Sequence, residues 1–227
     1  MANVLVVAPH PDDEVLGCGG TIARHAAAGD CVRIIVVTRG IAALCSEKDV
    51  TRVREEQCAS SHILGAEGIE YLDFPAAALD TIPAYTIADA IKRAIDRSQP
   101  EVIYAPHWGD VHTDHKITYL ATLVASRPCN QHKVHRLLCY ETPSETEWGT
   151  PSATDAFLPS VFTDISTQLE KKVKAFECFH SQLREAPHPR SIANIRALAQ
   201  VRGAVVCVPA AEAFVLVREI NQSSSPW

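Results

Sequence analysis

The chain has 227 residues, of which 47% are apolar and 21% are charged, and its formal net charge is −6. This length and composition are those of one globular domain that can bury a substantial core. The negative net charge gives no electrostatic support for binding nucleic acid or an anionic membrane surface, so neither is expected as a partner.

The N-terminal segment and the cysteines bear on the compartment in which the protein is expected. The first ten residues carry no basic segment and only a short apolar run, so they predict a β-strand rather than a signal peptide. No segment approaches the ~18 consecutive apolar residues of a membrane span. The eight cysteines form no C-x-x-C pair, and we interpret them as reduced thiols. We therefore expect a cytoplasmic protein without membrane insertion.

Short apolar runs rich in Val and Ile alternate with segments of helical periodicity along most of the chain. In chain order, strands are predicted at residues 4–8, 32–38, 68–74, 102–105, 136–141, 161–165 and 213–218. Helices are predicted at 21–28, 49–64, 86–97, 114–126, 166–182 and 191–202. Gly65 is expected to end the second helix, and Ser166 to cap the fifth. This alternation predicts an α/β fold with a mainly parallel sheet flanked by helices.

No internal repeat and no linker divides the chain. We therefore predict a single domain at residues 1–220, followed by a flexible C-terminal tail at 221–227.

The first dense group of ionisable residues directly follows the first predicted strand, in the segment Ala8-Pro9-His10-Pro11-Asp12-Asp13-Glu14. In an open parallel sheet ligands bind beyond the carboxyl ends of the strands, and such a group cannot be buried there without partners. A metal such as zinc, which accepts imidazole and carboxylate ligands, would satisfy it. His10 and Asp13 can then face one point, which leaves Asp12 to act on a metal-bound water. The alternative is a polar turn in which Asp12 or Asp13 caps the next helix.

A second group follows the strand predicted at 102–105, in the segment Pro106-His107-Trp108-Gly109-Asp110-Val111-His112-Thr113-Asp114-His115. It should open at the same sheet edge, where a further ligand would complete a His-Asp-His set with one open position, as a hydrolytic zinc requires. Because a carboxylate favours the protonated form of a neighbouring imidazole, Asp114 is expected to make His112 a cation that stabilises an oxyanion or protonates a leaving amine. The alternative is that His112 and His115 are surface residues at a helix start.

These motifs resemble those of the PIG-L/LmbE-like deacetylases, which include N-acetylglucosaminyl-phosphatidylinositol de-N-acetylases and bacterial amino-sugar deacetylases. The matching segments are Pro9-His10-Pro11-Asp12-Asp13-Glu14 and His112-Thr113-Asp114-His115, with weaker matches at Arg54-Glu55-Glu56 and Ala211-Glu212-Ala213-Phe214. They follow the expected order over nearly the whole chain. The resemblance implies a Rossmann-like α/β fold.

The resemblance also implies a role for each matching residue. It implies that zinc is held by His10, Asp13 and His115, and that Asp12 is the general base. It implies that His112, backed by Asp114, stabilises the tetrahedral intermediate, and that Arg54 reaches the substrate.

Two further segments have a functional and a structural interpretation. Residues 142–159 are expected to form a Pro-rich loop longer than most connections, and Trp148 within it either stacks on a sugar face or is tucked into the body of the protein. Whether this loop lines the cleft is left open. The glycines of Gly17-Cys18-Gly19-Gly20 do not match a dinucleotide-binding motif, because Ile22 occupies a position that requires a small residue. We expect them to allow close packing of a helix against a strand.

We therefore predict a zinc-dependent N-deacetylase, a hydrolase of linear amide C–N bonds that removes the N-acetyl group from an amino sugar or its glycoconjugate. The expected partner is a small-molecule amino-sugar substrate. The sequence leaves open an amidase that acts on another N-acyl conjugate, such as a thiol conjugate or an antibiotic, and a non-catalytic sugar- or nucleotide-binding domain. It also leaves open Fe(II) or another divalent ion in place of zinc, and assembly as a homo-oligomer.

Overall fold

The first strand, β1 (Asn3–Ala8), lies inside a seven-stranded sheet because its side chains are apolar on both faces. Val4, Val6 and Ala8 pack into one core, whereas Leu5 and Val7 pack into another on the opposite face. The computed structural model describes residues 1–41 and 43–221, and its sheet has the order β3-β2-β1-β4-β5-β7-β6. The other strands are β2 (Cys31–Arg39), β3 (Gly68–Pro75), β4 (Val102–Pro106), β5 (Arg136–Tyr140), β6 (Val161–Asp164) and β7 (Ala211–Glu219).

The strands β1 to β5 run parallel to one another, and β7 is antiparallel to both β5 and β6. The prediction of an α/β domain with a mainly parallel sheet is therefore confirmed. From β1 the chain builds the sheet outward through β2 and β3 and then returns to place β4 on the other side of β1. The point between β1 and β4 is the topological switch point, where open α/β sheets bind their ligands.

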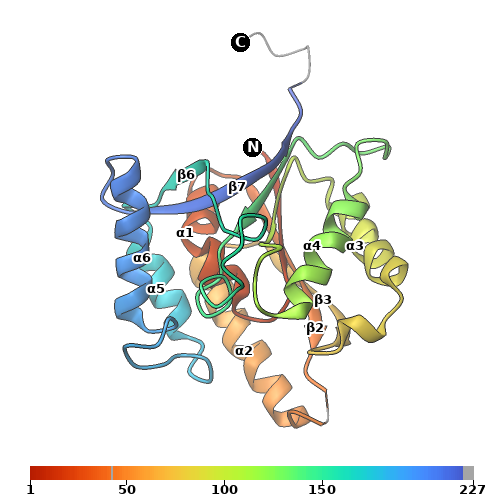
Figure 1. Cartoon of the computed structure of the whole chain (residues 1–227), viewed down its shortest axis with the longest axis horizontal. Coiled ribbons are helices and arrows are strands. Elements are labelled where there is room, and N and C mark those ends of the chain that lie inside the picture. The colour runs from red at the N-terminus through yellow and green to blue at the C-terminus, as the bar shows by residue number, and fades with distance from the viewer. Residues whose placement is uncertain (42, 222–227) are drawn as a thin grey trace.

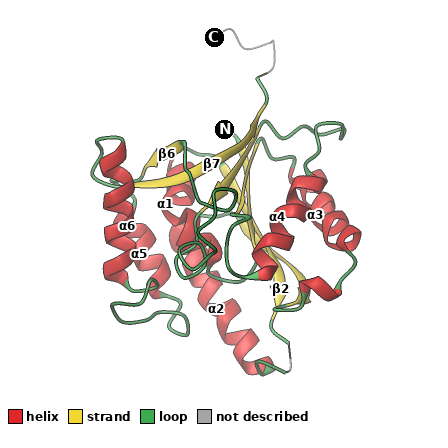
Figure 2. Cartoon of the chain, in the orientation of Figure 1, coloured by secondary structure: helices red, strands yellow, loops and turns green. Residues whose placement is uncertain are grey.

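Helices cover both faces of the sheet (Figures 1 and 2). One face carries α1 (Asp13–Ala27), α2 (Glu47–Leu64), α5 (Leu169–Glu177) and α6 (Ile192–Val205). The other carries α3 (Ala84–Ser98) and α4 (Thr113–Ala125), and a short 3-10 helix, η1 (Leu79–Thr81), precedes α3. No helix in the described ranges is long and apolar enough to cross a membrane.

Local sequence explains several helix ends. Ser46 caps α2 through a reciprocal pair of hydrogen bonds with Asp49, and Gly65 ends this helix, as predicted, in the left-handed conformation with φ 86°. Ser191 caps α6, since its side chain accepts a hydrogen bond from the backbone N–H of Asn194.

Two predicted helices have different bounds in the structure. The helix predicted at 21–28 begins earlier, at Asp13. Its first turns are rich in glycine, which has low helix propensity, so the sequence pattern does not indicate them. Tertiary packing buries these turns in the folded protein. The helix predicted at 166–182 is only Leu169–Glu177, and Ser166 does not cap it. The hydroxyl of Ser166 instead donates to Asp164 Oδ1 at 2.5 Å, in the turn after β6. Residues 222–227, which form most of the predicted tail, lie outside the described residues.

The glycines of α1 allow the close packing that the sequence predicts. A Cβ at Gly17 would overlap the ring of Tyr140, and a Cβ at Gly20 would lie 2.7 Å from Ile165. Tyr140 cannot easily move away, because its side chain is fully buried and its hydroxyl donates to the carbonyl oxygen of Val7 at 2.9 Å. The first turns of α1 therefore lie directly against β5.

We predict that Gly17→Ala lowers the free energy of unfolding by roughly 1–3 kcal/mol, because the added methyl group overpacks a dense core. Chemical denaturation of the purified protein measures the change. Gly68→Ala is the matched control, since no atom lies within 4 Å of a Cβ at that position. An equal loss of stability in both variants would contradict the proposed overlap with Tyr140.

Candidate active site

The loop between β1 and α1 brings several ionisable side chains to the switch point. Asp12 precedes the helix with φ 108°, a backbone conformation that is rare outside glycine and often marks functional sites. Asp13 begins α1, and its Oδ2 atom accepts a hydrogen bond from the backbone N–H of His10 at 2.8 Å. These contacts turn the carboxylate of Asp13 back toward the side chain of His10.

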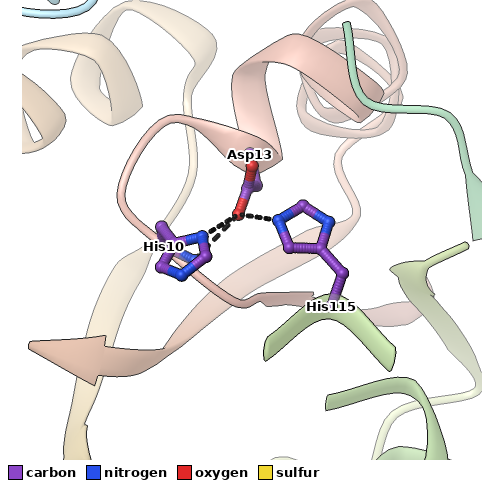
Figure 3. Close-up of side chains that lie close together, drawn as sticks. All are labelled: His10, Asp13 and His115. Atoms are coloured by element: carbon purple, nitrogen blue, oxygen red, sulfur yellow. Dashed lines mark hydrogen bonds and ion pairs between the residues drawn. The ribbon is translucent and has the colours of Figure 1, made fainter. Parts of the chain in front are cut away.

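His10 and Asp13 meet His115, which comes from the first turn of α4 (Figure 3). Asp13 Oδ2 lies 3.3 Å from His10 Nδ1 and 3.3 Å from His115 Nε2. One ligand atom from each of the three residues lies within 4.8 Å of the other two, an arrangement that could hold a metal ion. The structure thus brings together the three residues predicted as metal ligands.

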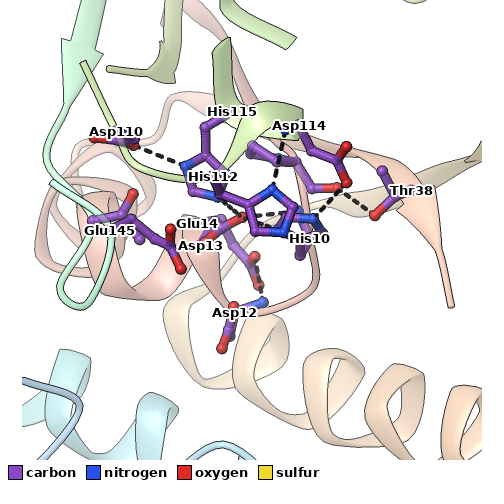
Figure 4. Close-up of polar contacts among 12 residues, drawn as sticks. His10, Asp12, Asp13, Glu14, Thr38, Asp110, His112, Asp114, His115 and Glu145 are labelled. Atoms are coloured by element: carbon purple, nitrogen blue, oxygen red, sulfur yellow. Dashed lines mark hydrogen bonds and ion pairs between the residues drawn. The ribbon is translucent and has the colours of Figure 1, made fainter. Parts of the chain in front are cut away.

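The two imidazoles of this cluster each contact a second carboxylate through the ring nitrogen that faces away from Asp13 (Figure 4). His115 Nδ1 lies 2.8 Å from Asp110 Oδ2, and His10 Nε2 lies 3.0 Å from Asp114 Oδ2. Carboxylates that bind the outer nitrogen of a histidine orient the ring and fix the tautomer that ligates metal. The inner nitrogens, His10 Nδ1 and His115 Nε2, are therefore the ones presented to Asp13.

Asp114 does not make the side-chain contact that the sequence predicted. Its carboxylate is committed to His10 and to the backbone N–H groups of Ala77 and Leu79, at 2.6 and 3.2 Å. His112 instead caps α4, and its Nδ1 accepts a hydrogen bond from the backbone N–H of Asp114 at 3.1 Å. This contact makes His112 a neutral imidazole with its proton on Nε2.

The lowered pKa of His112 also favours the neutral ring. Burial, and then the proximity of His10, lower it below its ordinary value, although Asp114 acts in the opposite direction. Because the Asp114 carboxylate is hydrogen-bonded to His10, these contacts favour a neutral His112 over the predicted cation. A neutral Nε2–H remains a hydrogen-bond donor at the site.

The three residues of the candidate metal cluster have strongly shifted pKa values. Burial alone would lower the pKa of His10, but hydrogen bonds to Asp114 and Asp13 outweigh it and raise the pKa to about 9. Burial likewise opposes protonation of His115, but the charge of Asp13 and a hydrogen bond to Asp110 raise its pKa to about 10. Burial would raise the pKa of Asp13, yet the two imidazoles hold it well below its usual range. These shifts favour protonated imidazoles paired with an ionised Asp13.

Asp12 lies beside this cluster, and its carboxyl group pairs with Arg190. Burial raises the pKa of its carboxyl group to about 7, against the opposing effect of the nearby Arg190 guanidinium. Arg190 Nη1 donates to Asp12 Oδ2 at 2.9 Å, although the two residues are 178 positions apart in the sequence. A carboxylate with a pKa near neutrality that lies next to a metal site is suited to act as a general base.

A pocket of about 530 Å³ opens onto these side chains. His10, Asp12 and His112 line it on the side of the metal cluster. Arg54 also lines it, and its guanidinium pairs with Asp73 and lies 4.1 Å from the centroid of the Tyr71 ring. Arg54 thus lies on the wall of the pocket, and its contact with the substrate stays a prediction.

Trp148 lies elsewhere. Its side chain is 54% exposed, and its ring makes an edge contact with His188 at a centroid distance of 5.7 Å. It is not among the residues that line the pocket, so the structure does not support its predicted contact with the substrate. The loop that carries it nevertheless reaches the pocket, through Glu145.

Sequence reasoning assigned no role to Asp110 and no individual role to Glu145 or Arg190. Asp110 stands five residues before His115 in a segment dense in histidine and aspartate, which is a local signal that could have identified it. Arg190 and Glu145 come from long connections without regular periodicity. The proximity of Arg190 to Asp12 and to Glu145 arises only from the tertiary structure.

Comparisons with known proteins agree with the geometry. A family model described as PIG-L: GlcNAc-PI de-N-acetylase matches residues 5–126. The chain is 33% identical over 173 residues to an uncharacterized deacetylase of Escherichia coli, YaiS, which corresponds to 73% of this chain and 83% of YaiS. It is 27% identical over 221 residues to diacetylchitobiose deacetylase of Thermococcus kodakarensis, which corresponds to 84% of this chain and 76% of that enzyme.

Not all relatives carry the name of a deacetylase. The chain is 27% identical over 210 residues to 4-oxalmesaconate hydratase of Pseudomonas putida, over 79% of this chain and 74% of the hydratase. Among solved structures, the conserved protein TT1542 from Thermus thermophilus superposes with a TM-score of 0.77 at 28% identity. That match covers 100% of this chain and 99% of the other.

The pKa values of the cluster predict how metal affinity depends on pH. Because His10 and His115 must lose their protons to ligate a metal, and their pKa values are raised, protons compete with the metal throughout the neutral range. With two protons displaced, the affinity for a divalent metal ion should rise about a hundredfold for each pH unit between 6 and 8. Competition with a chelator at several pH values measures this slope. His132→Asn, which alters a histidine bound to the carbonyl oxygen of Pro100, should leave it unchanged. A pH-independent affinity would exclude protonated ligands.

Proposed function

Because the chain belongs to the PIG-L family of de-N-acetylases, we propose that it is a zinc-dependent hydrolase that removes the N-acetyl group from an amino sugar or its glycoconjugate. The observation that carries the proposal is the convergence of two imidazoles and one carboxylate at the switch point of the sheet, beside a further carboxylate with a raised pKa. The substrate class is supported by the relatives, one of which is named for its action on diacetylchitobiose.

The donor set fits a catalytic zinc. His10, Asp13 and His115 supply two nitrogen ligands and one oxygen ligand, and three protein ligands leave one coordination position open for water or substrate. Asp110 and Asp114 supply the outer carboxylates that zinc-ligating histidines usually have. Zinc bound there would polarise the amide carbonyl and lower the pKa of a bound water to roughly 7.

The residues around the metal position then transfer the protons and stabilise the negative charge that forms on the carbonyl oxygen. Asp12 accepts the proton from the attacking water, as its position in the pocket and its raised pKa support. The neutral Nε2–H of His112 donates a hydrogen bond to the oxygen that becomes negative when water adds to the acetyl carbonyl. When the C–N bond breaks, Asp12 returns its proton to the leaving amine, and the products are acetate and the free amino sugar.

Hydration is the second chemistry represented among the relatives, through the hydratase from Pseudomonas putida. A hydratase also needs an activated water and a general base, so the metal cluster by itself does not separate the two reactions. The family assignment and the two relatives named as deacetylases favour deacetylation. An amidase acting on another N-acyl conjugate would use the same residues as a deacetylase.

We predict that the purified protein binds about one zinc per chain and releases acetate from N-acetylglucosamine conjugates. Metal analysis and an acetate assay, before and after chelation and after adding zinc back, measure both properties. Fe(II) and other divalent ions are tested in the same reconstitution. Metal binding with release of a different acyl acid would reassign the enzyme as another amidase. A protein that binds no metal under any condition would refute the proposal.

Two substitutions separate the proposed general base from the metal ligands. Asp12→Asn should retain zinc and lower kcat by about 10²–10⁴-fold, since the amide cannot accept the proton. Asparagine is chosen because it tolerates the positive φ of this position better than most residues. His115→Ala should lose the metal. If Asp12→Asn loses zinc as fully as His115→Ala, then Asp12 is a ligand and its assignment as the base is wrong.

A further inference from the structure

Part of the pocket wall beside the candidate metal cluster is formed by Glu145, Gln182 and Arg190, which the proposed reaction steps do not use as reacting groups. Glu145 belongs to the loop that follows β5, and the other two belong to the connection between α5 and α6. Because these segments differ in chain position from the loops that supply the metal ligands, they form a separate part of the site.

Glu145 presents an unsatisfied acceptor. Its side chain is only 13% exposed, and its Oε2 atom is buried without a hydrogen-bond partner among the described residues. A buried carboxylate oxygen without a partner is costly, so this carboxylate is incompletely satisfied by the protein. Oε2 has almost no exposed surface, and the atom left for a ligand is Oε1, on the side of Arg190. Figure 4 shows Glu145 among the side chains that surround the metal cluster.

Arg190 presents unsatisfied donors next to that acceptor. Its Nε donates to Ser144 Oγ at 2.7 Å, and its Nη1 donates to Asp12 Oδ2 at 2.9 Å and to Gln182 Oε1 at 3.0 Å. These contacts hold the guanidinium in one orientation. Its Nη2 lies 3.7 Å from Glu145 Oε1, too far for a hydrogen bond, and has no other partner in the described part of the chain.

The spacing of these two groups suits one hydroxyl group. An oxygen atom at ordinary hydrogen-bond distance from both Nη2 and Oε1 can accept from Arg190 and donate to Glu145 at the same time. An ammonium group offers donors without an acceptor, an amide carries its donor and its acceptor on two separate atoms, and a carboxylate or phosphate would be repelled by Glu145. The pair is therefore matched to a neutral ligand that carries hydroxyl groups.

We propose that Glu145 and Arg190 form a hydroxyl-binding subsite, which selects the sugar by one ring hydroxyl while the acetamido group lies at the metal cluster. The hydroxyl-binding geometry is independent of the proposed deacetylation. Only the identification of the ligand as a sugar rests on that proposed function. Arg190 in this arrangement also positions Asp12, so that sugar binding and the general base share one guanidinium.

The test compares Glu145→Gln with the wild type on the methyl glycoside of N-acetylglucosamine and on its 3-, 4- and 6-deoxy analogues. In the wild type, loss of the recognised hydroxyl should lower kcat/KM about tenfold, as expected for a hydrogen bond to a charged group. Glu145→Gln should lower kcat/KM for the parent sugar by a similar factor, mainly by raising KM. This variant should also have the same kcat/KM for the parent sugar and for the deoxy analogue that lacks the recognised hydroxyl. A merely structural role of Glu145 would lower activity on all four sugars equally.

Glu147→Gln is the matched control on the same loop. Glu147 is exposed, and its Oε1 accepts the backbone N–H of Ser144 at 2.7 Å, a contact that the amide oxygen of glutamine preserves. This variant should behave as the wild type on all four sugars. If Glu145→Gln does so too while the wild type releases acetate, the subsite is refuted and the proposed function stands.

A binding measurement keeps the two proposals separate if the wild type releases no acetate. Titration of the same methyl glycoside into the wild-type protein, followed by NMR, then reports binding alone. Binding that is weakened about tenfold in Glu145→Gln and unchanged in Glu147→Gln would support the subsite although deacetylation had failed. Equal binding by all three proteins, or no binding by any, would overturn it.

Discussion

The arrangement of this protein depends on one buried carboxylate, Asp13, that lies 3.3 Å from each of two imidazoles. A charge in the interior is tolerated only when its partners are close and are themselves satisfied. Here the partners are satisfied by Asp110 and Asp114, and Asp114 is in turn bound by the backbone of the segment before η1. Three segments are thereby tied to one point, in a geometry that suits a metal ion.

The secondary structure around Asp13 keeps that point rigid. Glu212 of β7 accepts the backbone N–H groups of Gly20 and Thr21 at 2.9 and 2.6 Å. Lys172 of α5 donates to the same carboxylate at 2.6 Å and to the carbonyl oxygen of Leu16 at 2.7 Å. These contacts hold α1 between β7 and α5, and α1 carries Asp13 at its N-terminus. The weakly matching segment around Glu212 thus acquires a structural role at a distance from the metal cluster.

The site is divided between two kinds of segment. The metal cluster and Asp12 come from short connections that leave β1 and β4 at the centre of the sheet, where packing on both faces fixes their positions. The opposite wall comes from long connections that follow β5 and α5, which are free to differ without disturbing the core. Shared chemistry with varied substrates is the consequence expected of such a division.

Arg190 links the two parts, since it contacts both Asp12 and Ser144. Three side chains from separate segments fix the orientation of the guanidinium. Because its nitrogens form a rigid planar fork, Nη1 can bind Asp12 while Nη2 remains directed toward Glu145. If the proposed roles of Asp12 and Arg190 hold, one guanidinium therefore links sugar recognition to the orientation of the general base.

The sequence by itself determined the fold class and identified the residues of the candidate metal cluster. Continuous apolar strands require a sheet covered on both faces, and motifs that directly follow two such strands must meet at one edge, which placed His10, Asp13 and His115 together. Only the tertiary structure decided that Asp114 binds His10 rather than His112, that α1 begins at Asp13, and that Glu145 and Arg190 face the pocket. The reason is that periodicity and spacing specify which elements form and where they end. The direction of a polar side chain depends instead on donors and acceptors supplied by segments far away in the chain.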